Sequence, residues 1–174
     1  MPLARRQLLA LGGGGAAAAV AGAVIGALHL SSSAGASTLL SYSFQQLEGG
    51  ATRLRDWRQP IILCNFWATW CAPCREEVPL LIAAKQQFAA YGLEIAGIGI
   101  DNAAKLRQFV RDFQINYPVL TASGDTSGLL QALGDGAAAL PYSVLLDNRR
   151  RISYRKLGVW SKTELEREIR AAIG

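Results

Sequence analysis

The sequence predicts an α/β fold in which a mixed central sheet is flanked by helices. Two runs, 61–67 and 93–100, are almost entirely apolar, which is typical of strands buried on both faces of a sheet. Each run is followed by apolar residues at helical spacing, so strands and helices alternate along the chain. Two strands around a turn, 142–146 and 152–157, and a last helix close the chain. Alternation favours parallel strands and the closing hairpin adds antiparallel ones, so the sheet is expected to be mixed.

The first 36 residues are predicted to be an export signal or a membrane anchor. The arginine pair at 5–6 precedes an uncharged, largely apolar run, 8–30, and a small-residue site ends at Ala36. The pair resembles a twin-arginine signal, although the usual Ser or Thr before it is an alanine here. The apolar run exceeds the ~20 residues that span a bilayer, so the chain is either cleaved near Ala36 or anchored through 8–30. A buried helix of the domain is the remaining alternative. Both main interpretations place the protein in the periplasm, outside the cytoplasm.

The remaining residues, 37–174, suit a single domain with one core, and a monomer is expected. Removal of 1–36 leaves 16 basic and 13 acidic residues, a net charge of +3. This excess is small, and no basic stripe is interleaved with aromatic residues, so nucleic-acid binding is not expected. The longest basic run, 149–151, lies between two strands. It is interpreted as a solvated turn, with a contact to anionic lipid as the alternative.

The first half of the domain is expected to begin with a β-hairpin and to continue into the central strand. Alternating side chains in 41–47, a Glu-Gly-Gly turn and a return strand at 52–54 form the predicted hairpin. After the strand at 61–67, a helix is expected to begin near Cys74. Pro79 should kink this helix, because proline removes a backbone hydrogen bond.

The second half is expected to add four strands and three helices. The strand at 93–100 ends at an Asp-Asn pair that can cap a helix with apolar residues at i, i+3, i+4 and i+7. A short strand at 117–120 and a short helix at 125–133 follow. The closing hairpin then leads to a capping box at 161–164, with Trp160 placed as its hydrophobic staple, which opens the last helix.

Two cysteines, Cys71 and Cys74, lie between the central strand and its helix, with two residues between them. A structural disulfide, a metal site and a redox pair are the possible interpretations. A disulfide between cysteines with only two residues between them closes a very short loop, so it would stabilise the fold little. The only histidine of the chain, His29, lies in the export segment, and there is no second C-x-x-C for a zinc site. The redox interpretation is therefore favoured, because one sulfur can attack a disulfide and the other can release the product.

The segment 65–79, Asn-Phe-Trp-Ala-Thr-Trp-Cys-Ala-Pro-Cys-Arg-Glu-Glu-Val-Pro, resembles the active-site segment of thioredoxin-fold reductases. It most resembles the bacterial extracytoplasmic branch of TlpA, ResA and cytochrome c maturation thioredoxins. The resemblance runs from about Tyr42 to the C-terminus and implies a thioredoxin fold with an N-terminal β-hairpin extension. It implies that Cys71 is the attacking thiolate and Cys74 the resolving thiol. The redox-active disulfide of this pair is expected to be the only redox group, with no cofactor or metal.

The resemblance assigns further positions around the cysteine pair. Glu77 matches a glutamate that lies beneath the disulfide and exchanges the proton of the resolving thiol, whereas the alternative is a solvated acid of the first helical turn. Asn65 stands where cytosolic thioredoxins carry a buried aspartate, and an amide cannot accept that proton. Leu140-Pro141 matches the cis-proline that exposes backbone to the substrate. The residue after it, Tyr142, departs from the family's usual Thr or Glu and leaves the substrate preference open.

Other residues near the motif are interpreted by position. Trp70 is expected to shield the site and to contact partners, and Ala72 and Pro73, between the cysteines, are expected to contact the substrate. Trp67 is expected to support the core. The third cysteine, Cys64, lies in the apolar strand and is interpreted as an inert buried thiol. A regulatory or resolving role is its alternative.

These expectations combine into an extracytoplasmic thiol–disulfide oxidoreductase. The resemblance implies that it reduces disulfides of client proteins, such as apocytochromes c or copper-site proteins, and is itself reduced by a thiol donor in the membrane. A net oxidant that forms disulfides is the first alternative. A copper-delivering binding protein is less favoured, because such proteins use C-x-x-x-C and a distant histidine. A thiol peroxidase is disfavoured by the second cysteine.

Overall fold

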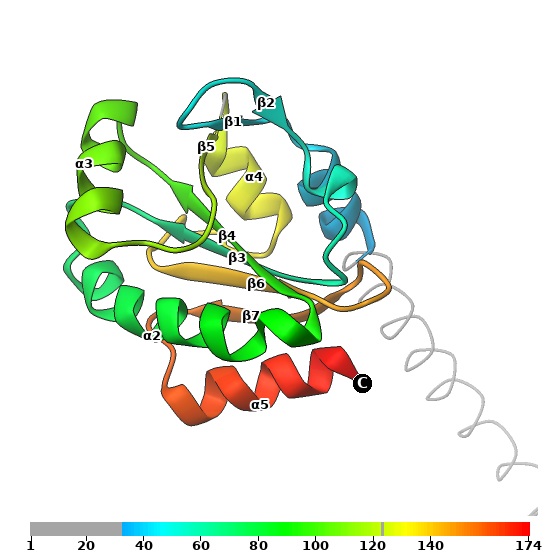
Figure 1. Ribbon diagram of the computed structural model, residues 1–174. Coiled ribbons are helices and arrows are strands. Elements are labelled where there is room, and N and C mark those ends of the chain that lie inside the picture. The colour runs from blue at the N-terminus through cyan, green and yellow to red at the C-terminus, as the bar shows by residue number, and fades with distance from the viewer. Residues whose placement is uncertain (1–32, 123) are drawn as a thin grey trace, which may run out of the picture.

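The computed structural model describes residues 33–122 and 124–174. They form one seven-stranded sheet with the strand order β2-β1-β5-β4-β3-β6-β7, flanked by helices (Figure 1). The strands are β1 (Phe44–Gln46), β2 (Ala51–Thr52), β3 (Ile61–Trp67), β4 (Leu93–Gly99), β5 (Val119–Ala122), β6 (Tyr142–Leu146) and β7 (Ile152–Leu157). After a first helix at 33–41, the helices are α2 (Ala72–Phe88), α3 (Ala103–Phe113), α4 (Thr126–Ala132) and α5 (Lys162–Ile173).

The sheet is mixed, as the sequence predicts. β3, β4 and β5 are parallel to one another, whereas β6 pairs antiparallel with β3 and β7 pairs antiparallel with β6. All seven residues of the central strand β3 are buried. Its side chains alternate between two core clusters, so that Leu63 and Trp67 face α2, α3 and α5, and Cys64 and Phe66 face α4 and the first helix. Figure 1 shows these helices as two layers around the sheet.

The predicted N-terminal hairpin is present but shorter than expected. Phe44 pairs with Thr52, and Leu54 begins a single 3-10 turn instead of continuing the strand. β1 also pairs antiparallel with β5, which joins the hairpin to the main sheet. The hairpin is therefore the edge of the sheet and not a separate appendage.

The first helix, 33–41, is the main departure from the predicted elements. Its small residues let it approach the domain closely. A side chain at Gly35 would meet the carbonyl oxygen of Ala132 at 2.8 Å, and Ala36 and Leu39 are buried in the core beside α4. The predicted boundary between 36 and 37 falls inside this helix, and the apolar run 8–30 lies outside the described residues. Within 33–122 and 124–174, no helix combines the length and the apolar character that crossing a membrane requires.

The remaining elements follow the predicted order with small shifts. β6 and β7 have the predicted bounds, and α3, α4 and α5 begin after the capping side chains of Asn102, Asp125 and Ser161. α2 begins at Ala72, two residues before the expected start. It continues through Pro79 to Phe88.

Candidate active site

The two cysteines of the motif form a disulfide at the start of α2. Cys71 is the N-cap residue, and its Sγ accepts a hydrogen bond from the backbone N–H of Cys74 at 3.3 Å. Pro73 occupies the first helical turn, where its missing N–H costs nothing. Unpaired N–H groups and the dipole at a helix N-terminus stabilise negative charge, so the reduced Cys71 sulfur is placed where a thiolate is favoured.

Glu77 lies one helical turn after Cys74, on the same buried face of α2. Its side chain is only 1% exposed, so the interpretation as a solvated acid is wrong. One carboxylate oxygen accepts from Asn65 Nδ2 at 2.8 Å, and the other accepts from the backbone N–H of Trp160 at 2.9 Å. Burial raises the pKa of Glu77, although these hydrogen bonds and the charge of Lys156 act in the opposite direction.

Ser143 completes a ring of hydrogen bonds behind the disulfide. Its hydroxyl oxygen accepts from Asn65 Nδ2 and from the indole N–H of Trp160, both at 3.0 Å. Four elements thereby meet at one buried cluster: β3, α2, β6 and the segment before α5. Sequence patterns did not indicate a role for Ser143, and they indicated only helix capping for Trp160. The signal available for Ser143 was a lone hydroxyl within the apolar run 142–146.

A second buried group faces this cluster. The hydroxyl of Tyr117 has no hydrogen-bond partner among the described residues. Burial and then the negative charge of Glu77 raise the pKa of Tyr117. The interior behind the disulfide is thus a poorly solvated region in which an added charge is costly.

The Leu140–Pro141 peptide bond is cis, and it immediately precedes β6. The carbonyl oxygen of Pro141 accepts from the N–H of Gly158 at 2.8 Å, which ties this bond to the segment after β7. Leu140 has no such backbone bond among the described residues. The backbone groups that could bind an extended substrate at this bond are therefore those of Leu140, because the carbonyl oxygen of Pro141 is already bonded and its ring is buried.

Exposed apolar side chains surround the disulfide. Trp70 is 70% exposed, and Ala72 and Pro73 are also exposed, as expected for contacts with another molecule. Leu157 and Val159 are exposed on either side of Gly158, whose N–H donates to the carbonyl oxygen of Pro141. Sequence patterns did not single out these two residues, because this hydrogen bond joins segments that are far apart in the chain.

Three other residues of the motif region have structural positions. Tyr142 is buried, and its hydroxyl donates to the carbonyl oxygen of Leu133 at 2.8 Å, so the residue after the cis-proline does not face a substrate. Trp67 packs on Phe109 with ring centroids 4.7 Å apart, as expected for core support. Thr69 donates to the carboxylate of Asp101, which fixes the loop before Trp70 and lowers the pKa of Asp101.

Cys64 is fully buried and unbonded. It lies on the opposite face of the sheet from Cys71 and Cys74, which belong to the other core cluster. Burial raises the pKa of the Cys64 thiol, so the thiolate that exchange requires is disfavoured. The regulatory or resolving alternative for this cysteine therefore finds no support.

The raised pKa of Glu77 predicts a pH-dependent stability. The unfolded chain releases the Glu77 proton near its ordinary value of 4.5, whereas the folded protein holds it to higher pH. Stability is therefore expected to fall as pH rises above 4.5, by at most about 1.4 kcal/mol per pH unit, until the folded carboxyl has ionised. Urea unfolding of the oxidised protein between about pH 4 and 8 measures this slope.

Glu77→Gln should remove that slope, and Glu76→Gln, which changes an exposed carboxyl one residue earlier, should keep it. Equal pH dependence in the wild type and Glu77→Gln would show that the folded environment does not retain the proton.

Comparisons with known proteins agree with this geometry. A family model described as the AhpC/TSA family matches residues 37–167. The thiol-disulfide oxidoreductase ResA of Geobacillus thermodenitrificans is 27% identical over 134 residues, which cover 76% of this chain and 75% of the relative. The thioredoxin-like protein YneN of Bacillus subtilis is 27% identical over 132 residues, 74% of each chain. A solved thiol:disulfide interchange protein of Chlorobium tepidum has a TM-score of 0.66 at 25% identity, and covers 76% of this chain and 93% of that structure.

Proposed function

Because the chain belongs to the AhpC/TSA family, we propose that it is an extracytoplasmic thiol–disulfide oxidoreductase that reduces disulfides in client proteins. The observation that carries this proposal is the disulfide at the N-terminus of α2, bordered by exposed apolar side chains and backed by a buried carboxyl group. The export-type segment, 1–36, supports the location.

The reaction follows from the two sulfurs and the proton acceptor behind them. In the reduced enzyme, the Cys71 thiolate attacks a client disulfide, forms a mixed disulfide, and expels one client sulfur as a thiolate that takes a proton. Cys74 then loses its proton and attacks the Cys71 sulfur, which expels the second client sulfur. The enzyme is left oxidised, and the client has gained two electrons and two protons.

Glu77 is the proposed acceptor of the Cys74 proton. It is the carboxyl group one turn below that thiol, and its raised pKa suits proton exchange closer to neutral pH. Asn65 occupies the other polar position nearby, but its amide cannot accept a proton. Its role is to hold one carboxylate oxygen of Glu77.

The reducing direction requires an electron donor, and a membrane thiol protein is proposed. The client is a protein with an accessible disulfide, and apocytochromes c or copper-site proteins are the proposed classes. Reduction potential tests the direction. A reduction potential of about −270 mV supports net reduction, and one of about −120 mV would make the protein a net oxidant.

The exchange itself is tested by trapping. Cys74→Ser should accumulate clients as mixed disulfides through Cys71, because the thiol that releases the client is absent. The complexes are isolated without reductant and identified by mass spectrometry after reduction. Cys71→Ser is the matched control and should capture none. Identical profiles from the two variants would refute the assigned order of attack.

A further inference from the structure

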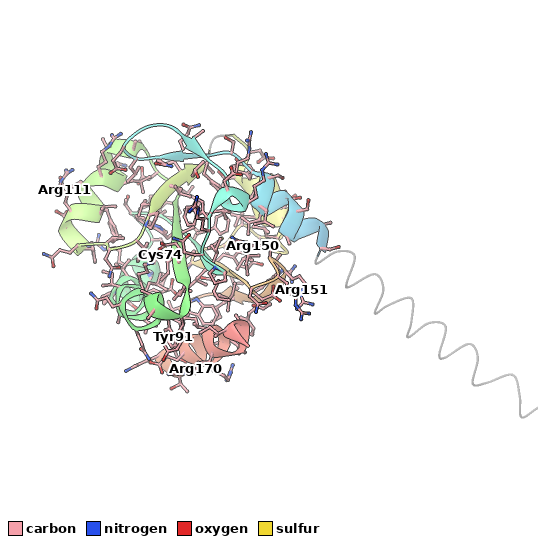
Figure 2. All side chains as sticks on the ribbon, turned by 45° about the vertical axis from the view of Figure 1, so that its right-hand side comes forward. Cys74, Tyr91, Arg111, Arg150, Arg151 and Arg170 are labelled. Atoms are coloured by element: carbon pink, nitrogen blue, oxygen red, sulfur yellow. A yellow bond between two sulfur atoms is a disulfide. The ribbon has the colours of Figure 1, made fainter. Side chains whose placement is uncertain are left out.

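A large hollow on the described surface lies where the first helix meets the turn between β6 and β7. Its volume is about 1490 Å³, and the end of α5 forms another side. Asp147 is the only acidic side chain that lines it. Five arginines line it: Arg55, Arg149, Arg150, Arg151 and Arg155. Figure 2 shows Arg150 and Arg151 on the side of the first helix, with Arg111 at the opposite side of the domain. We call this surface the arginine hollow.

The turn that presents these arginines is held in one conformation. The Asp147 carboxylate accepts from the backbone N–H groups of Arg149 and Arg151, at 2.9 Å each, and from the Arg151 side chain at 2.7 Å. Arg150 donates to the carbonyl oxygen of Trp57, while its other terminal nitrogen, Nη1, is buried without a partner among the described residues. The interpretation of 149–151 as merely a solvated turn is therefore incomplete.

Two arginines of the hollow have guanidinium groups that are available to bind another molecule. The Arg149 side chain is exposed, and no contact of its guanidinium is found in the described part of the chain. Arg55 has only a 3.8 Å ion pair with Asp56 between two well-exposed side chains, which is a weak interaction. Guanidinium groups bind phosphate in a bidentate manner, so the hollow suits an array of phosphate groups.

The sequence supplies the reason to expect a membrane there. The uncharged run 8–30 is long enough to span a bilayer, and only residues 31 and 32 separate it from the first helix. The three Cα–Cα steps from residue 30 to residue 33 reach at most about 11 Å. A chain anchored through 8–30 would therefore enter the domain beside Ser33 and Ser37, which line the arginine hollow. Exposed charges attract one another over about one screening length, roughly 8–10 Å. Arginines beside this entry point would therefore lie close enough to the lipid phosphates to interact with them.

We propose that the arginine hollow docks on anionic lipid headgroups of the membrane in which residues 8–30 are anchored. The proposal rests on the extracytoplasmic location given above and adds an orientation to it. β6 lies between Pro141, on the side of the disulfide, and Asp147, which lines the hollow, and the six steps of extended chain from one to the other span about 20 Å. Docking through the hollow would point the disulfide away from the bilayer.

The test uses the full chain in lipid nanodiscs and hydrogen–deuterium exchange. Peptides covering 147–151 should exchange at least about three-fold more slowly in discs containing phosphatidylglycerol than in discs of phosphatidylcholine alone. About 0.5 M salt should remove this protection, because it screens exposed charges. Peptides covering 68–71, at the disulfide end, should exchange equally in both lipids. Inorganic phosphate added to phosphatidylcholine discs is the third arm.

Arg55→Gln with Arg149→Gln should abolish the lipid-dependent protection. The matched control, Arg111→Gln with Arg167→Gln, removes the same charge from exposed side chains outside the hollow and should retain the lipid-dependent protection.

Three results of this experiment would overturn the proposal: equal exchange in both lipids, equal effects of the two pairs of substitutions, or equal protection by free phosphate. The proposal would also be overturned if the protein isolated from its own host had lost residues 8–30, which its intact mass would show. Disulfide exchange by both pairs in the same discs should be unchanged, which separates this result from a failure of the proposed function.

Discussion

Cys71→Ser is expected to lower the rate of disulfide exchange at least about 1000-fold. The bond to the client forms at the Cys71 sulfur, and no other thiol can replace it, because Cys74 is more deeply buried and Cys64 lies behind the sheet. The rate is measured as reduction of a protein disulfide by the chemically reduced enzyme, under single-turnover conditions.

Cys64→Ala is the matched control for that loss. Its thiol faces the other core cluster, so the rate of exchange should equal that of the wild type. The substitution leaves a small cavity and should cost on the order of 1 kcal/mol of stability. A slow Cys64→Ala variant that is fully folded by circular dichroism would restore a role for this cysteine in exchange.

Trp160→Ala is expected to lower the free energy of unfolding by about 3–5 kcal/mol. Trp160 is buried, its ring packs against Tyr154 with centroids 5.5 Å apart, and its indole N–H donates to Ser143. Truncation removes the packing and leaves the hydroxyl with one donor fewer. Urea unfolding of the oxidised protein measures the loss.

Trp160→Phe separates packing from hydrogen bonding. It retains an aromatic ring and the backbone N–H that binds Glu77, but it lacks the indole donor to Ser143. Trp160→Phe should lower the free energy of unfolding by about 1–2 kcal/mol, since it loses one hydrogen bond and leaves a small cavity. If Phe and Ala at this position destabilise equally, the packing of the indole is not the source of the stability.

Local sequence patterns predicted most of the elements and the reactive pair. Strand and helix periodicity are properties of neighbouring residues, which is why β6 and β7 were placed correctly from 142–146 and 152–157. The pair of Cys71 and Cys74 was identifiable for the same reason, since three positions separate the two residues along the chain. Glu77 was singled out by the resemblance, because it stands three residues after Cys74 as the matching glutamate of the resembled branch does.

Contacts between distant segments could not be predicted in the same way. Ser143 is 78 positions from its partner Asn65, and their contact depends on the register of β6 against β3. Trp160 reaches Glu77 across 83 positions. The first helix, 33–41, was missed because its Ser, Gly and Ala residues match a cleavage region as well as a closely packed helix, and only the contact with α4 distinguishes the two.

The position of Cys64 gives the protein an internal chemical reporter. In the oxidised protein it is the only free thiol of the chain, and it is fully buried in β3. An alkylating reagent can reach it only when the packing around β3 opens. The rate at which a single added mass accumulates would therefore follow the opening of the sheet at β3, in native buffer and without an introduced label.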